Sequence, residues 1–328
     1  MSIKNDDSMY YYDDKKQIAI YNSDCVELAK TLPDNSIDFS IYSPPFSDLF
    51  VYSDSHWDMG NCSSDEEFFS QYRYLIKEMY RVMKPHRLIA VHCCDLQLIK
   101  SKDGIIGFKD FPGRIIAEHI KAGFIYHSRV TIYKDPVIEM QRTKANGLLY
   151  KQVCKDSTKS RQGRCDYLVI LKKYSNETNL EPVSREAFYD YIGSSVIAPY
   201  NTRNKEEYEK FYSINVWQRY ASPVWFDIDQ GKVLNSAIAK DDKDERHMCP
   251  LQLDVIQRAI ELWSNPNEIV YSPFMGIGSE GVGAINMDRG FIGSELKKSY
   301  FQIAKKNIKD TIDLQNHLFH DEDYPEPK

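Results

Sequence analysis

One short segment near the C-terminus constrains the fold of this chain more than any other. It has a strand pattern at each end, from Glu268 to Tyr271 and from Gly290 to Glu295. Between these patterns lie three glycines spaced G-x-G-x-x-G, at Gly276, Gly278 and Gly281, followed by a helix-forming run. Glycines at this spacing let the backbone turn tightly and approach a ligand before a helix begins. The segment therefore predicts a strand–helix–strand unit with a binding turn.

Strand and helix patterns alternate in the same way along most of the chain. The helical patterns repeat apolar residues every 3.6 positions, and the strand patterns are short apolar or alternating runs. This order is typical of a doubly wound, mostly parallel α/β sheet, a Rossmann-like fold. Further strands are predicted at 18–21, 37–42, 88–91, 126–133 and 167–171, and helices at 26–31, 65–83, 114–122, 205–211, 251–263 and 298–308.

The strand at 37–42 ends in a rigid corner, Ser43-Pro44-Pro45-Phe46. Two consecutive prolines fix φ and have no backbone N–H, so the chain leaves the sheet in one shape. The corner offers the Ser43 hydroxyl oxygen and the Pro44 carbonyl as acceptors, beside an aromatic ring. This set suits a planar base that carries an exocyclic amino group. A plain strand-ending turn is the alternative interpretation.

The composition excludes several classes of protein. No apolar run approaches the roughly 18–20 residues of a membrane span, and the polar, acidic N-terminus does not resemble a signal peptide. The seven cysteines include no C-x-x-C pair, which indicates reduced thiols in a cytoplasm and argues against a zinc site. The net charge is −6, so binding to nucleic acid would require a local basic surface.

One stretch supplies such local charge. From Arg129 to Lys173 there are eleven Lys or Arg and four Asp or Glu, a local net charge of +7. In an acidic protein, this loop-like block is where a phosphate backbone would bind, although a solvated surface is the alternative. The candidates for phosphate contacts are Arg142, Lys144, Lys151 and Arg161.

Two classes of cofactor fit the glycine turn. Glu295, at the end of the following strand, would accept hydrogen bonds from ribose hydroxyls, which both dinucleotides and S-adenosylmethionine (AdoMet) carry. A nicotinamide or flavin oxidoreductase is therefore one alternative. A dinucleotide fold usually opens with this unit, whereas here the unit comes last, which favours AdoMet.

Taken together, the motifs resemble those of DNA amino-methyltransferases in which the catalytic motif precedes the cofactor motif, the beta arrangement. The resemblance covers about residues 18–308, without most of 175–240. It rests on Asn22 to Cys25, Leu32 to Asp38, Ser43 to Phe46, Asp166 to Val169, Trp217, His247 to Leu251 and Ser272 to Gly278.

Other features of the resemblance concern single segments. The basic stretch from Lys134 to Cys165 is similar to that of phage and prophage members. Two positions depart from the family pattern: Ser272 stands where Asp is usual, and His247-Met248-Cys249-Pro250 stands where His-Pro is usual. The first departure puts one contact near the methionine end of the cofactor in doubt.

The resemblance also implies a division of the chain and a set of partners. Double-stranded DNA would be the substrate, and a homodimer and a cognate restriction nuclease are further expectations. The expected parts are a flexible N-terminal arm at 1–16, a catalytic half at 17–133, a DNA-contacting region at 134–245, an AdoMet-binding half at 246–310 and a tail at 311–328.

The implied reaction is direct methyl transfer from AdoMet to the exocyclic amine of a flipped base. Ser43 and the carbonyl of Pro44 would orient the amine, on a corner fixed by Pro45, and Phe46 would stack on the base. No catalytic base is required by this scheme.

The resemblance assigns the cofactor contacts as well. Glu295 would bind the ribose, Asp24 the adenine amino group and Cys25 the ring edge. The alternatives are an N-cap role for Asp24 and a surface position for Glu295. The remaining contacts would come from Pro273, Phe274, Gly276, Gly278 and Ser279.

The residue at position 43 bears on the target base. In the family, Ser-Pro-Pro followed by Tyr or Phe goes mostly with N4 of cytosine, and Asp-Pro-Pro-Tyr mostly with N6 of adenine. A hydroxyl can also donate to cytosine N3 while it accepts from N4. N4-cytosine methylation is therefore favoured over N6-adenine methylation. A catalytically silent relative that binds nucleic acid is an alternative of another class.

Overall fold

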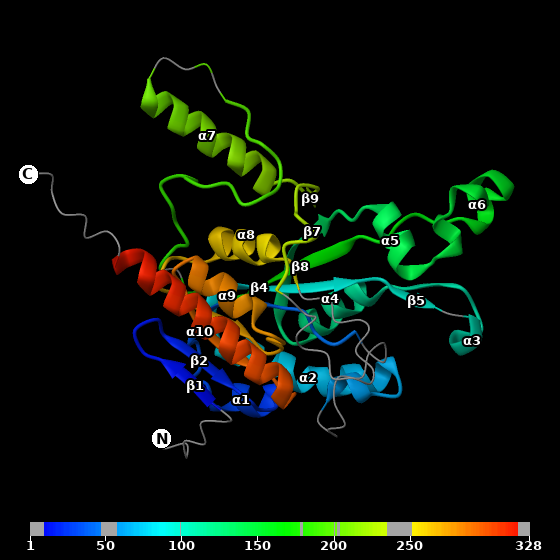
Figure 1. Ribbon diagram of the computed structural model, residues 1–328. Coiled ribbons are helices and arrows are strands. Elements are labelled where there is room, and N and C mark those ends of the chain that lie inside the picture. Colours follow the sequence, from blue (N-terminus) through cyan, green and yellow to red (C-terminus); the bar gives the residue numbers. More distant parts are fainter. Residues whose placement is uncertain are drawn as a thin grey trace, which may run out of the picture.

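A nine-stranded sheet forms the centre of the protein (Figure 1), in the order β1-β2-β11-β10-β3-β4-β8-β7-β9. The computed structural model describes residues 10–46, 58–98, 100–177, 180–199, 201, 204–234 and 251–320. Strands β2, β11, β10, β3 and β4 run parallel, and β1 and β8 pair antiparallel with their neighbours. The strands are β1 (Tyr10–Asp13), β2 (Ile18–Tyr21), β3 (Ile37–Tyr42), β4 (Met83–Cys94), β7 (Phe124–Ile132), β8 (Asp166–Lys173), β9 (Val224–Trp225), β10 (Ile269–Ser272) and β11 (Gly290–Ser294), with β5 (Leu96–Leu98) and β6 (Gly107–Lys109) in a separate pair.

Helices cover both faces of this sheet. Helices α8, α9 and α10 bury apolar side chains against one face, and α1, α2 and α4 against the other. This arrangement confirms the predicted doubly wound, mostly parallel α/β fold. The helices are α1 (Cys25–Thr31), α2 (Asp65–Val82), α3 (Lys100–Asp103), α4 (Phe111–Lys121), α5 (Pro136–Thr143), α6 (Tyr150–Lys155), α7 (Lys205–Tyr220), α8 (Leu253–Trp263), α9 (Ser279–Asn286) and α10 (Lys298–His320), with short 3-10 turns at Met59–Asn61, Asn146–Leu148 and Ser157–Lys159.

Both ends of the chain are more ordered than the sequence suggests. In the expected flexible arm, Tyr10–Asp13 forms β1, which pairs antiparallel with β2 and gives the sheet an extra edge strand. In the expected tail, α10 continues to His320 because its apolar stripe continues: Ile312 is buried in the core, and Gln315 donates to the carbonyl of Ile285 at 2.8 Å. Regular structure therefore extends beyond the predicted limits at 16 and 311.

The basic block is also more regular than the predicted loop. Asp135 caps α5 by accepting hydrogen bonds from the backbone N–H groups of Val137 and Ile138, and Pro136 occupies the first helical turn, where it needs no N–H. Helix α6 follows, and α5 and α6 extend away from the sheet (Figure 1). The strands β8 and β9, which also lie within 134–245, belong to the central sheet.

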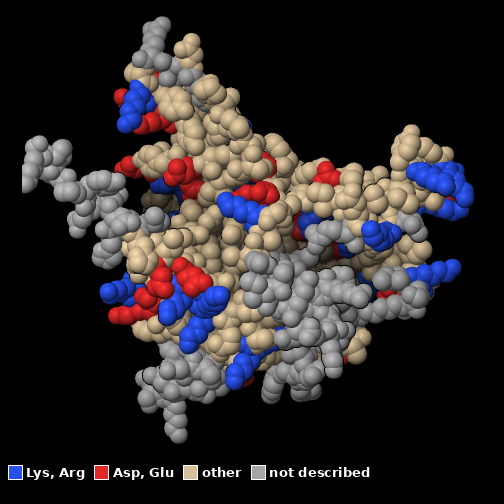
Figure 2. Space-filling view, in the orientation of Figure 1, with Lys and Arg blue, Asp and Glu red and all other residues tan. Residues whose placement is uncertain are grey.

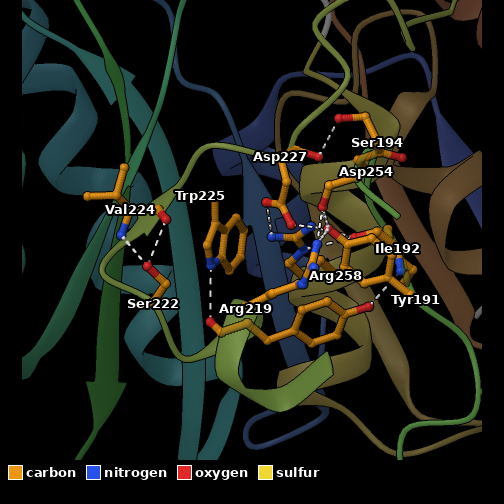
Figure 3. Close-up of polar contacts among 12 residues, drawn as sticks. Tyr191, Ile192, Ser194, Arg219, Ser222, Val224, Trp225, Asp227, Asp254 and Arg258 are labelled. Atoms are coloured by element: carbon orange, nitrogen blue, oxygen red, sulfur yellow. Dashed lines mark hydrogen bonds and ion pairs between the residues drawn. The ribbon is translucent and has the colours of Figure 1, made fainter. Parts of the chain in front are cut away.

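Helix α7 and its flanking segments project from the molecule above α8 (Figure 1), and Arg258 of α8 joins this segment to the core (Figure 3). The Arg258 side chain is fully buried, and its Nη1 donates to Asp227 Oδ1 at 2.9 Å. Its Nε donates to the carbonyl of Ile192 at 3.1 Å, and its guanidinium lies 4.9 Å from the ring of Trp225. A buried charge paired in this way fixes one geometry for the contact.

Candidate active site

The serine-proline corner and the glycine turn lie side by side because their strands are neighbours. Strands β3 and β10 pair in parallel, with Ser40 opposite Tyr271, so their carboxyl ends reach the same edge of the sheet. From this point the chain order runs outward in both directions, through β11 on one side and β4 on the other. Such a switch point is where open α/β sheets bind ligands.

At the end of β3, Pro44 is buried, and Ser43, Pro45 and Phe46 are half-buried. The Phe46 ring packs edge-on against Phe111 at a centroid distance of 6.0 Å. The structure therefore holds the predicted catalytic corner in a partly covered position, with the aromatic ring supported from α4.

The Ser43 hydroxyl is the first member of a chain of polar contacts. Its Oγ lies 3.2 Å from His92 Nδ1, at the end of the neighbouring strand β4. His92 Nε2 lies 3.0 Å from Asp166 Oδ2 on β8, and Lys134 Nζ lies 2.5 Å from the same oxygen. Burial would raise the pKa of Asp166, but His92 and Lys134 outweigh it and hold that pKa at about 2. Asp166 is thus ionised.

The sequence interpretation missed His92, and it gave Asp166 and Lys134 no role in the site. The available signal was position: His92 follows Val91, just beyond the predicted strand at 88–91, which is adjacent to the strand that ends at Ser43. Polar residues at the carboxyl ends of adjacent parallel strands meet at one edge. The partner strand β8 is antiparallel, so its first residue, Asp166, reaches that edge from the other direction.

The glycine turn leaves space for a ligand. Gly276 has φ +53°, and a Cβ there would meet no atom within 4 Å. Gly278 has φ +91° and is the N-cap residue of α9. Gly281 lies within α9, where a Cβ would come within 2.8 Å of Ile308. Gly276 therefore leaves open space beside the backbone, Gly278 allows a left-handed turn, and Gly281 allows close contact between helices.

Two buried carboxyl groups flank this turn. Glu295 accepts hydrogen bonds from the backbone N–H of Gly276 at 3.0 Å and of Lys297 at 2.8 Å. Burial, with a contribution from Asp58, raises the pKa of Glu295 to about 8. Burial also raises the pKa of Glu280 to about 8, and Glu295 contributes to that shift. Among the described residues, no Lys or Arg pairs with either carboxyl group, so no basic side chain opposes the protonated form.

The other predicted cofactor residues lie near the same edge of the sheet. Asp24 caps α1, with Oδ1 accepting from the N–H groups of Val26 and Glu27, so its alternative N-cap role is confirmed. Its Oδ2 has no hydrogen-bond partner in the part of the chain that the structure describes. The remaining members are placed as follows: Cys25 and Ser279 are buried, Phe274 lies 5.9 Å from the Tyr42 ring, and the Pro273 carbonyl accepts from Ser294 Oγ at 2.8 Å.

Ser272, where the family pattern has Asp, is fully buried at the end of β10. Its Oγ has no hydrogen-bond partner among the residues described. The acidic side chains around the glycine turn are instead Glu280, Glu295, Asp24 and Asp58.

The predicted phosphate contacts fall into two groups. Lys144 and Lys151 are exposed, and Figure 2 shows basic side chains gathered over α6. Arg161 is largely covered, because its Nη2 donates to Glu139 at 2.9 Å and its guanidinium lies 5.4 Å from the Phe108 ring. The side chain of Arg142, and the whole of His247, lie outside the described residues.

Comparison with known proteins gives the family. The family model for DNA methylases, which covers N6- and N4-type enzymes, matches residues 37–306, and this range includes the serine-proline corner and the glycine turn. The chain belongs to the DNA methylase family. It is a DNA amino-methyltransferase by family, as the motifs predicted.

Individual relatives are distant in sequence but extend over most of the chain. The type II methyltransferase M.BglII of Bacillus subtilis is 21% identical over 91% of this chain and 71% of that protein. TTHA0409 of Thermus thermophilus, solved in complex with S-adenosyl-L-methionine, superposes with a TM-score of 0.58 at 17% identity, covering 89% of this chain and 93% of the other. The PvuII DNA methyltransferase, cytosine-N4-specific, gives a TM-score of 0.55 at 16% identity, covering 90% and 92%. These structures share the fold of this DNA methylase.

Two kinds of feature are absent from the described residues. No helix in that part of the chain is long and apolar enough to cross a membrane. The same residues contain no cluster of three His, Cys, Asp or Glu that could bind a metal ion. The predicted cytoplasmic location stays a prediction.

Proposed function

We propose that this protein transfers a methyl group from AdoMet to the exocyclic amine of a flipped base in double-stranded DNA, with N4 of cytosine as the target. The observation that carries the proposal is the placement of Ser43-Pro44-Pro45-Phe46 and the glycine turn on adjacent parallel strands, at the switch point of the sheet. A base and an adenosine-bearing cofactor bound to these two turns would face each other.

The pocket residues fit AdoMet. Open space beside Gly276 would admit the adenosine, and the Glu295 carboxylate would accept hydrogen bonds from the ribose hydroxyls. Asp24 Oδ2 would bind the adenine amino group, next to Cys25. AdoMet, when bound, supplies an electrophilic methyl group on a positively charged sulfur, which suits a pocket rich in carboxyl groups.

The corner residues orient the target. The Ser43 Oγ and Pro44 carbonyl would accept hydrogen bonds from the two amine hydrogens, which directs the nitrogen lone pair away from the ring plane and toward the methyl group. Phe46 would stack on the base, a contact worth about 1–3 kcal/mol. Correct orientation supplies much of the rate in such a transfer.

The choice of cytosine rests on the residue type at position 43, and the fold shared with the cytosine-N4-specific PvuII enzyme is compatible with it. The contact with His92 weakens the sequence argument that Ser43 donates to cytosine N3. His92 Nε2 donates a hydrogen bond to Asp166, so Nδ1 is an acceptor, and the Ser43 hydroxyl donates to it at 3.2 Å or to the His92 carbonyl oxygen at 3.5 Å. Ser43 then only accepts. N6-adenine methylation is the second candidate for this reason.

A transfer assay tests the proposal. The purified protein would be incubated with labelled AdoMet and unmethylated genomic DNA, and the nucleosides analysed by mass spectrometry. We expect N4-methylcytosine, and we expect Ser43→Ala to lower the rate on the order of 100-fold because one orienting acceptor is lost. N6-methyladenine alone would overturn the choice of base, and no methylated base would overturn the function.

Double-stranded DNA would bind along the basic surface of α5 and α6, with Lys144 and Lys151 as phosphate contacts. Arg142 stays a candidate from the sequence. Arg161 is a weaker candidate, since its guanidinium already forms an ion pair with Glu139. A homodimer, a partner restriction nuclease and a phage origin stay predictions.

A further inference from the structure

Ser43, His92, Asp166 and Lys134 form a series of polar contacts. One end of the series is Ser43 Oγ, the atom that contacts the target amine in the proposed function. His92 and Asp166 are 6% and 4% exposed, so their hydrogen bond is shielded from water. Lys134, whose side chain is 29% exposed, joins the far end of the chain to the surface. The scheme of direct methyl transfer described above gives no task to the last three residues.

The protonation states follow from the contacts. An ionised Asp166 can only accept, so the Nε2 atom of His92 carries its hydrogen toward it. In the neutral His92 ring, Nδ1 is then an acceptor 3.2 Å from Ser43 Oγ, and the His92 carbonyl oxygen is a second acceptor at 3.5 Å. With its hydrogen donated to the nearer Nδ1, Ser43 Oγ can still accept through both lone pairs.

The same set of residue types performs acyl transfer in serine hydrolases, but that use does not fit here. A serine nucleophile needs backbone N–H groups to stabilise the oxyanion, and the residue after the serine commonly supplies one. Here the next two residues, Pro44 and Pro45, have no N–H. The arrangement therefore serves a hydroxyl that accepts and passes hydrogen bonds, rather than one that attacks a carbonyl.

We propose that His92 is the positioning residue that fixes Ser43 as an acceptor and takes up, through Ser43, the proton that the methylated amine must lose. This inference rests on the proposed function. The amine nitrogen forms its bond to the methyl carbon while the carbon–sulfur bond breaks, with its electron pair going to sulfur. The nitrogen, now positively charged, gives a proton to Ser43 Oγ as the Ser43 hydroxyl hydrogen passes to His92 Nδ1. The N–H electron pair stays on nitrogen, and the imidazolium is stabilised by the Asp166 carboxylate.

Charged and titratable groups surround His92 on several elements. Asp166 faces it from β8, and Lys134 from the segment after β7. Cys94, which follows His92 on β4, has its pKa raised to about 12, chiefly by burial and then by Asp166, so it stays neutral. Asp95 and Arg164 also lie close to Cys94 and contribute charges of opposite sign.

The test is a pH profile of single-turnover methyl transfer, with AdoMet and DNA both saturating so that binding equilibria do not contribute. The proposal requires an acceptor nitrogen on His92, so the wild-type rate should fall toward low pH and give the profile an acid limb. His92→Gln should lower the plateau rate by about 10²–10⁴-fold and abolish this acid limb. AdoMet affinity, measured by calorimetry, should not change.

A second, isosteric variant tests the orientation of the ring. In Asp166→Asn, the amide can donate to Nε2, which would place the imidazole hydrogen on Nδ1, where it blocks acceptance from Ser43. A loss of rate of similar size to that of His92→Gln is expected. His119→Gln is the matched control, since His119 is a fully buried histidine on α4 whose pKa burial lowers to about 4. It should retain the acid limb, whatever its effect on stability.

Three outcomes would overturn the inference. The first is a wild-type pH profile without an acid limb. The second is a folded His92→Gln protein that keeps both the wild-type rate of methyl transfer and the acid limb. The third is an Asp166→Asn protein with the wild-type rate. If His92→Gln does not fold, the wild-type profile and Asp166→Asn decide. If the wild type methylates no DNA amine, the proposed function fails instead, which is a separate result.

Discussion

At the scale of single residues, the two buried glutamates beside the glycine turn give the proposed cofactor site a testable pH dependence. Burial raises the pKa of Glu295 and Glu280 from the ordinary value of 4.5 to about 8, so both are mostly protonated at pH 7 in the free protein. A ribose hydroxyl donates most strongly to an ionised carboxylate, and the cofactor brings positive charge. Binding should therefore release protons.

The prediction is an AdoMet affinity that rises with pH and levels off above about 8. Below that value each proton released makes the dissociation constant fall about tenfold per pH unit. Glu295→Gln should weaken binding and remove its share of the slope, whereas Glu280→Gln should retain the dependence due to Glu295. Calorimetry in buffers of different ionisation enthalpy measures both the affinity and the protons released. A flat profile from pH 6 to 9 would contradict this prediction.

The same pKa shifts affect the stability of the cofactor-free protein in the opposite direction: a rise in pH favours AdoMet binding but lowers the free energy of unfolding. In the unfolded chain these groups ionise near 4.5, whereas in the folded protein they hold their protons up to about 8. The folded state thus binds more protons between these values, and the free energy of unfolding falls as the pH rises through this window. Bound cofactor would offset the loss.

At the scale of elements, the turn between β10 and α9 combines a left-handed backbone with open space. Gly276 and Gly278 both have positive φ, and of these two only Gly276 has empty space beside its backbone. A side chain at Gly276 would therefore not clash with the protein, and under the proposed function it would meet AdoMet. Stability and binding can be separated at this position.

Gly276→Ala should cost roughly 1–2 kcal/mol of unfolding free energy, the usual cost of a left-handed alanine, and should strongly weaken AdoMet binding. Gly104→Ala is the matched control: Gly104 has φ +74°, also has empty space beside it, and lies far along the chain next to α3. It should cost a similar free energy in urea titrations and leave AdoMet affinity unchanged. Equal affinities for the two variants would show that the cofactor does not bind at Gly276.

At the scale of the whole molecule, the charge distribution decides how an acidic protein binds DNA. The net charge of −6 would repel phosphate on average, while α5 and α6 present exposed lysines on an arm beside the site. Several basic residues of the block are already paired within the protein, including Arg161 with Glu139 and Lys134 with Asp166. Only part of the local charge of +7 is thus available to DNA.

We predict that replacing Lys144 and Lys151 together by Gln weakens DNA binding and lowers the slope of log K against log salt by about 2, since each phosphate contact contributes about 0.9. The control is the pair Lys306→Gln and Lys309→Gln, exposed lysines on α10, which should leave the slope unchanged. Fluorescence anisotropy with a labelled duplex at several salt concentrations gives both slopes. The prediction fails if the two double variants have the same slope.

The sequence by itself determined the sheet, the two turns at its edge and the family, because strand and helix periodicity, prolines and glycines act locally on the backbone. It also located Glu295 and Asp24, whose positions follow from the ends of predicted elements. It did not predict β1, which depends on an edge pairing, or the full length of α10, which depends on core contacts such as that of Ile312. Only the tertiary structure decided that His92 and Asp166, 74 residues apart, meet Ser43, because that contact depends on the antiparallel insertion of β8 between β4 and β7. Local patterns carry no information on which distant strand becomes a neighbour, so the polar chain behind the catalytic corner was visible only in three dimensions.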